Sequence, residues 1–83
     1  MRHARPDYNR MQDPEGKIGE DEPVFILRAQ DELAPATIDH WSNLLEAHDG
    51  DPRAVKLARD WAQEMRHWQI SHKTKLPDLP QEG

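Results

Sequence analysis

An apolar repeat with helical spacing runs from Ile38 to His72 and is interrupted once, at Asp49-Gly50-Asp51. Pro35 and Pro52 each stand where a helix can begin, because proline is tolerated in the first turn. The sequence therefore predicts helices over 35–48 and 52–72. A connection this short forces two helices to run antiparallel, so we expect a mainly α protein built on an antiparallel helical hairpin.

The second predicted helix has the more regular pattern. Its apolar positions alternate at spacings of four and three, which is the heptad seam of helices that pack along their length. We expect this seam to meet a matching stripe on the first helix and to bury most of the three tryptophans. The heptad positions are Ala54, Ala58, Trp61, Met65, Trp68 and His72, and the matching stripe is Ile38, Trp41 and Leu45.

The chain is poor in core material. It has 83 residues, of which 35% are hydrophobic and 33% charged, and it has no cysteine to form a disulfide or a thiolate-ligated metal site. Ordering the backbone costs about 1–2 kcal/mol per residue, and two helices cannot shield three tryptophans from water by themselves. We therefore expect a homo-oligomer, most simply a dimer. The interface candidates are Tyr8, Phe25, Trp41, Trp61 and Met65.

Residues 1–22 show no periodic pattern and read as an extended arm, either a flexible terminus or a segment that orders on a neighbouring subunit. A single small domain over 23–72 follows. It opens with a strand-like run over 24–28, rich in β-branched and aromatic residues. No second strand-like segment is evident, so this run either pairs across subunits or lies half-solvated across the helices. Residues 73–83 form a tail that its prolines keep from continuing the helix.

The formal charge is −5, and most of the excess acid lies in the first 50 residues. Binding to nucleic acid through phosphate contacts usually needs a basic face, so general DNA or RNA binding is disfavoured. No run of apolar residues is long enough to span a bilayer or to act as a signal peptide, and we expect a cytoplasmic protein that does not associate with membranes.

The side chains that could carry catalysis or hold a metal are not arranged for it. Five histidines are present, but His67 and His72 fall on different faces of a helix and no His-Glu-x-x-His motif occurs. No glycine-rich phosphate loop is present, and no serine stands in a nucleophile motif. We expect no enzyme activity, no metal and no cofactor.

One segment suggests ligand binding, Arg28-Ala29-Gln30-Asp31, where the strand-like run ends and the first helix approaches. The Arg28 guanidinium could hold a phosphate or carboxylate in bidentate fashion, while Gln30 and Asp31 could read the edge of a base. Trp68, near the end of the second helix, is the candidate for stacking on that base. The alternative is structural: Arg28 pairs with a nearby carboxylate and Asp31 serves a turn.

Residues 19–31, GEDEPVFILRAQD, together with Asp7-Tyr8-Asn9-Arg10 and Ala34-Pro35-Ala36-Thr37, resemble a set of small uncharacterised proteins of tailed phages and prophages. The resemblance implies an accessory protein that works in a bacterial cytoplasm. Helix-rich phage proteins of this size include oligomers that sequester nucleotide immune signals and proteins that block a host enzyme.

These observations lead to three hypotheses about function. The first is a non-enzymatic phage-type protein that counters host defence by sequestering a small anionic, nucleotide-like ligand at subunit interfaces. The second is an inhibitor whose acidic N-terminal half binds a basic host protein. The third is a virion or assembly component that packs against its own copies.

Overall fold

The computed structural model describes residues 1–5 and 12–79. The described chain forms two strands and two helices, in the order β1 (Arg2–His3), β2 (Pro23–Val24), α1 (Ala34–Ala47) and α2 (Pro52–Ile70). Both helices lie in one compact unit, Arg28–Pro77, and the two strands lie in the other. The interface candidate Tyr8 lies outside the described residues.

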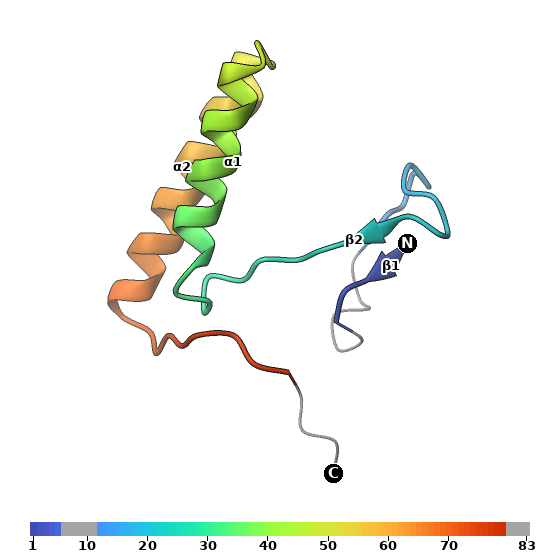
Figure 1. The fold of residues 1–83 in the computed structure, drawn as a ribbon. Helices are drawn as coiled ribbons and strands as arrows, with labels where there is room; N and C mark the ends of the chain where they lie inside the picture. The colour runs from blue at the N-terminus through green and yellow to red at the C-terminus, as the bar shows by residue number, and fades with distance from the viewer. Residues whose placement is uncertain (6–11, 80–83) are drawn as a thin grey trace. The chain divides into compact units, whose positions relative to one another are not determined.

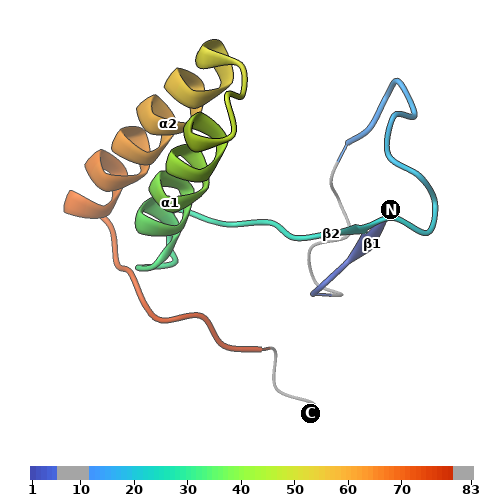
Figure 2. The same cartoon turned by 45° about the horizontal axis from the view of Figure 1, so that its top comes forward.

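The two helices form the predicted hairpin. α1 and α2 lie side by side and run in opposite directions, joined by a short turn (Figures 1 and 2). The expectation of a mainly helical protein with two helices is confirmed, and each helix boundary lies within two residues of the predicted one. Both helices have proline in the first turn, as predicted.

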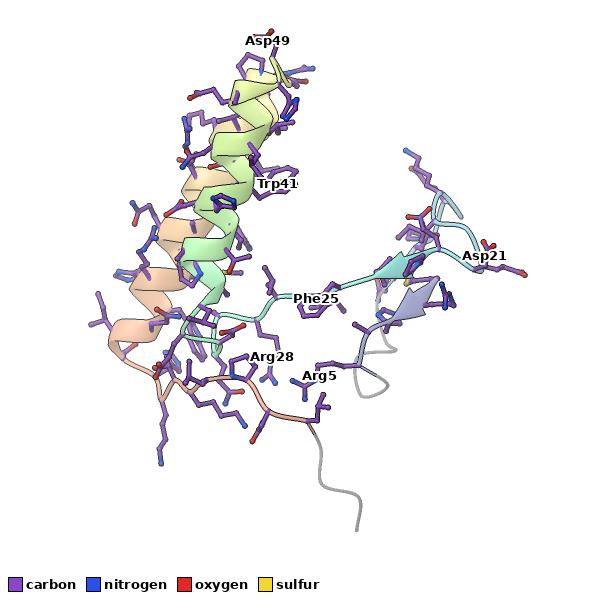
Figure 3. All side chains as sticks on the ribbon, viewed as in Figure 1. Arg5, Asp21, Phe25, Arg28, Trp41 and Asp49 are labelled. Carbon is purple, nitrogen blue, oxygen red and sulfur yellow. The ribbon has the colours of Figure 1, made fainter. Side chains whose placement is uncertain are left out.

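The turn between the helices is a Schellman motif. The N–H of Asp49 donates to the carbonyl of Glu46 at 3.1 Å, and the N–H of Gly50 donates to the carbonyl of Leu45 at 2.8 Å. Asp49, at the tip of the hairpin (Figure 3), takes the left-handed conformation with φ 56°, where glycine is the usual residue. Gly50 is needed for space, because a Cβ there would stand 2.9 Å from the Leu45 carbonyl oxygen.

We expect the two turn positions to respond in opposite directions. Asp49→Gly should raise the free energy of unfolding by roughly 0.5 kcal/mol because it relieves the left-handed conformation. Gly50→Ala should lower it by about 1–3 kcal/mol because the methyl group collides with Leu45. Urea unfolding followed by circular dichroism measures both. Gly19→Ala is the control, since a Cβ at Gly19 meets only ordinary contacts, the nearest at 3.5 Å. A neutral Gly50→Ala variant would contradict the account of the turn.

α2 begins at a side-chain cap. The Asp51 carboxylate accepts the backbone N–H of Arg53 at 2.9 Å and forms an ion pair with the Arg53 guanidinium at 2.8 Å. The side-chain hydrogen bond from Arg53, helped by its backbone N–H, lowers the pKa of Asp51 below its ordinary value of 3.8. The ionised carboxylate therefore stabilises the start of α2.

This cap predicts a contribution to acid sensitivity. Because the pKa of Asp51 is lower in the folded state, its contribution is fully present above the unfolded value of 3.8 and is lost as the pH falls through the folded value. Asp51→Asn keeps an oxygen for capping and removes the titration, so its unfolding temperature should fall less steeply than that of the wild type below about pH 4. Thermal unfolding across a pH series measures the difference. Equal slopes would contradict the assignment.

Small side chains close the seam between the helices. Ala34, Ser42 and Ala62 have no exposed surface and Val55 is 4% exposed. Ser42 satisfies its buried hydroxyl by donating to the carbonyl of Asp39 at 2.7 Å. Residues of this size let two backbones approach closely.

The predicted seam is therefore wrong for the tryptophans. Trp41 is 52% exposed and Trp61 59% exposed, and each stands one residue before a buried seam residue. One residue turns a helix by about 100°, so the true seam is rotated away from the predicted one. Apolar side chains occupy well over half the circumference of α2, and periodicity alone could not select among them. The smaller residues pack inside because the bulky indoles would hold the helices apart.

The N-terminal unit contains a short parallel strand pair, in which Arg2 lies opposite Pro23 and His3 opposite Val24. The N–H groups of Arg2 and Ala4 donate to the carbonyls of Glu22 and Val24, at 2.6 and 3.0 Å. The expectation that the chain holds no partner for the strand-like run is wrong. It failed because a two-residue polar strand has no hydrophobic alternation to mark it. The strand is also shorter than the predicted 24–28 and ends at Val24.

Candidate functional site

The two sides of the hairpin differ in chemistry. On one side, Arg59 of α2 binds Glu46 of α1 through both carboxylate oxygens, at 3.1 and 3.2 Å, and Asn43 at 3.0 Å. Arg66 of α2 forms an ion pair with Asp39 of α1. These bonds link the helices along one edge of the seam, which we call the polar side.

The Arg59–Glu46 pair also sets the charge of its members. The hydrogen bond and the positive charge of Arg59 lower the pKa of Glu46 below its ordinary value of 4.5. The same bond to Glu46 raises the pKa of Arg59. Both groups are open to solvent, so the pair orients the helices more than it stabilises them.

The opposite side of the seam is apolar. Arg59 and Arg66 lie three before and four after Ala62, whereas Trp61 lies one before it, and this spacing puts them on opposite sides of α2. On α1, Asp39 and Glu46 likewise lie three before and four after Ser42. Trp41 lies one before Ser42 and is therefore on the opposite side of α1. Figure 3 shows Trp41 standing out from α1 rather than entering the seam. We call this apolar side the tryptophan face. Its members are Trp41, Leu44, Leu57, Trp61, Met65 and Trp68.

A hollow of about 470 Å³ opens on the tryptophan face over the C-terminal half of α2. Four of its lining residues, Trp61, Glu64, Met65 and Trp68, follow the spacing i, i+3, i+4 and i+7. These positions form the four corners of the hole that accepts a side-chain knob when two helices pack. Ala29 adds a wall from the segment before α1. The hollow therefore has the shape of an unfilled helix-packing site.

The indole of Trp68 is held in place by His72. The two rings stack with centroids 3.9 Å apart and planes within 5° of parallel. His72 Nδ1 lies 2.7 Å from the carbonyl oxygen of Trp68 and 3.2 Å from Ser71 Oγ. One face of the indole is thereby covered within the chain, and Trp68 remains 37% exposed.

The segment before α1 is tied to the C-terminal end of α2. The side-chain amide of Gln69 donates to the carbonyls of Ala29 and Asp31, at 2.9 and 3.1 Å. Lys75, beyond α2, exchanges backbone hydrogen bonds of 3.0 Å with Gln30 and Glu32. Residues as far as Pro77 thus belong to the same unit as the hairpin.

Gln69 should therefore stabilise the end of the hairpin where α1 begins and α2 ends. We expect Gln69→Ala to lower the free energy of unfolding by about 1–2 kcal/mol, because two partly buried carbonyls lose a donor. The backbone N–H groups of Glu32 and Lys75 should exchange with solvent faster, which hydrogen exchange measures residue by residue. Gln63→Ala, on the exposed side of the same helix, should change neither quantity. Unchanged exchange at Lys75 in Gln69→Ala would contradict the role given to Gln69.

The predicted ligand-binding residues are only partly brought together. Ala29 and Trp68 line the same hollow, but Arg28, Gln30 and Asp31 are not among the residues that line it. The Asp31 carboxylate accepts the N–H of Leu33 at 2.8 Å, which is the turn role weighed as the alternative. The carbonyl of Arg28 accepts the N–H of Asp31 at 3.0 Å.

The interface candidates divide between the two units. Trp41, Trp61 and Met65 lie on the tryptophan face, where Met65 is half-buried. Phe25 lies in the N-terminal unit and is 70% exposed. Whether these residues meet another subunit stays a prediction.

Sequence reasoning missed Gln69 and Glu64. Val55, Ala62 and Gln69 are spaced seven residues apart and so lie on one side of the helix. This spacing in the sequence could have pointed to Gln69. Glu64 carried no distinguishing signal, since a glutamate on an exposed helix is ordinary until its neighbours are known.

In residues 1–5 and 12–79, no three side chains of the metal-binding types come close enough to hold an ion. Within that same part of the chain, neither helix combines the length and apolar character that crossing a bilayer requires. No family model, curated protein or solved structure matches this chain.

Proposed function

We propose that this protein is a non-enzymatic interaction protein whose working surface is the tryptophan face. The observation that carries the proposal is the placement of all three tryptophans on exposed positions while alanine, serine and valine close the seam. Exposed tryptophans at this density are unusual in a protein that acts alone, and tryptophan is enriched at the centres of protein interfaces.

The size of the face supports the same function. Leu44 is 48% exposed and Leu57 66%, in addition to the tryptophans. Since one tryptophan offers about 150–250 Å², the exposed apolar surface is on the order of 500 Å². Patches above a few hundred square ångströms mark sites of association in soluble proteins.

The shape of the hollow favours a helical partner over a nucleotide. A hole with corners at i, i+3, i+4 and i+7 fits a side chain from a facing helix. Glu64 stands at its wall, and the described residues that line it include two histidines but no lysine or arginine, so the hollow lacks a permanent positive charge to hold an anion. Of the three functions considered from the sequence, binding to a protein therefore has more support than capture of a nucleotide. The resemblance to small phage proteins leads us to expect a bacterial host protein or another copy of this chain as the partner.

Photocrosslinking in bacterial cells tests the proposal. Benzoylphenylalanine in place of Trp61 should give a discrete protein adduct on irradiation, because Trp61 lies at the centre of the tryptophan face. The same residue in place of Gln63, two positions along α2 and on its other side, is the matched control and should give little adduct.

Each outcome of that experiment decides the proposal. A discrete adduct at position 61 that is absent at position 63 supports a protein-binding face, whatever the partner is. No adduct at position 61, or equal adducts at both positions, would overturn it.

A further inference from the structure

We infer that the occupant of the tryptophan face is the same face of a second copy of this chain, with the α2 helices packed through their heptad positions. This inference rests on the proposed function, because it names the partner of that surface. Four features of the hairpin lead to it: a heptad repeat with exposed tryptophans, the hole on α2, the placement of charge, and the area of the face.

α2 carries two apolar stripes, and the hairpin leaves the tryptophans of one exposed. The stripe at Val55, Ala62 and Gln69 faces α1 or holds the segment before it. The heptad stripe runs one residue earlier, through Trp61 and Trp68. It continues across almost the whole length of α2. Its alanines and Met65 are half-buried in the described chain, whereas Trp61 and Trp68 stay exposed. A repeat of 3.5 residues sustained over this length is typical of a helix that packs against another helix.

The hollow on α2 is the matching half of such an interface. Trp61, Glu64, Met65 and Trp68 form a hole, and the same heptad stripe supplies large side chains that could act as knobs. A two-fold axis places equivalent surfaces opposite each other, so each copy would give knobs and holes at once. Two copies of the face are therefore complementary in shape, whereas an extended peptide would not supply knobs at helical spacing.

The charges favour a second copy over a basic protein. All four basic residues of α2 form ion pairs within the chain: Arg53 with Asp51, Lys56 with Asp60, Arg59 with Glu46, and Arg66 with Asp39. Among the described residues that line the hollow, Glu64 is the one carboxylate, and a surface that recognises a strongly basic partner would be expected to carry more.

The helices as wholes are oppositely charged. α1 carries two carboxylates and no lysine or arginine, whereas α2 carries four basic and two acidic groups. Both carboxylates of α1 are paired with Arg59 and Arg66 on the polar side of the same chain, so these charges lie away from the tryptophan face and do not oppose its contact with a second copy.

The area is in the range that a dimer needs. A stable interface removes about 800 Å² from each partner, of which somewhat more than half is apolar. The tryptophan face offers on the order of 500 Å² of apolar surface, so a polar rim of ordinary size completes it.

Sedimentation equilibrium of the purified chain tests the inference. The wild type should be a dimer at about 100 µM, where an interface of standard size associates. Trp61→Ser should raise the dissociation constant about 30-fold or more, because removal of a central tryptophan is costly and each substitution counts twice across a two-fold axis. Ile70→Ser is the matched control. Ile70 is 83% exposed on the same helix but outside the heptad stripe, so its loss should leave the dissociation constant unchanged.

Circular dichroism shows whether Trp61→Ser still folds. The photocrosslink at position 61 gives a second measurement, because benzoylphenylalanine keeps a large aromatic side chain at that position. An adduct of twice the chain mass supports the inference. A wild-type monomer, or a dimer equally stable in Trp61→Ser, would overturn it. A monomer that still forms an adduct with a different protein at position 61 would overturn the inference and leave the proposed function standing. Absence of any adduct at that position would overturn the proposed function itself.

Discussion

The burial of small side chains at Ala34, Ser42, Val55 and Ala62 is the constraint on which the hairpin depends. Side chains this small contribute little apolar area, and a hairpin held by them alone would be only marginally stable. A seam of small side chains has two consequences. It brings Arg59 and Arg66 within reach of the carboxylates on α1, and it leaves no room for indoles between the helices. The polar side and the tryptophan face therefore both follow from the burial of small side chains between the helices.

The ends of the hairpin are secured by specific bonds rather than by bulk. Asp49 and Gly50 close one end through the Schellman motif, and Gln69 with Lys75 closes the other by fixing the segment before α1. These bonds set the direction of the helices without burying apolar surface. Most of the large apolar side chains stay at the surface, which is the arrangement expected of a small fold that is completed by association.

Function follows from what the hairpin leaves uncovered. In the candidate ligand segment, residues 28–31, the backbone of Gln30 is hydrogen-bonded to Lys75 and the Asp31 carboxylate accepts the N–H of Leu33, just before α1. The heptad repeat, which the sequence predicts to be the seam between the helices, places Trp61 and Trp68 at the surface. The exposure of the two tryptophans of this repeat is best explained by a partner that covers them, and a second copy of the same face fits them in shape.

The sequence by itself determined the two helices, their starts within one residue of Pro35 and Pro52, and the antiparallel turn, because proline, glycine and helical spacing act over a few neighbouring residues. It also determined that α2 carries a heptad repeat. Only the tertiary structure decided which side of that helix faces α1, since the choice depends on how closely two backbones can approach and on which arginine reaches which carboxylate. The pairing of β2 with Arg2–His3 was likewise decided by tertiary contacts, because a two-residue strand has too little pattern to be recognised. The hole at Trp61, Glu64, Met65 and Trp68 became visible only once the side of α2 left free of α1 was known.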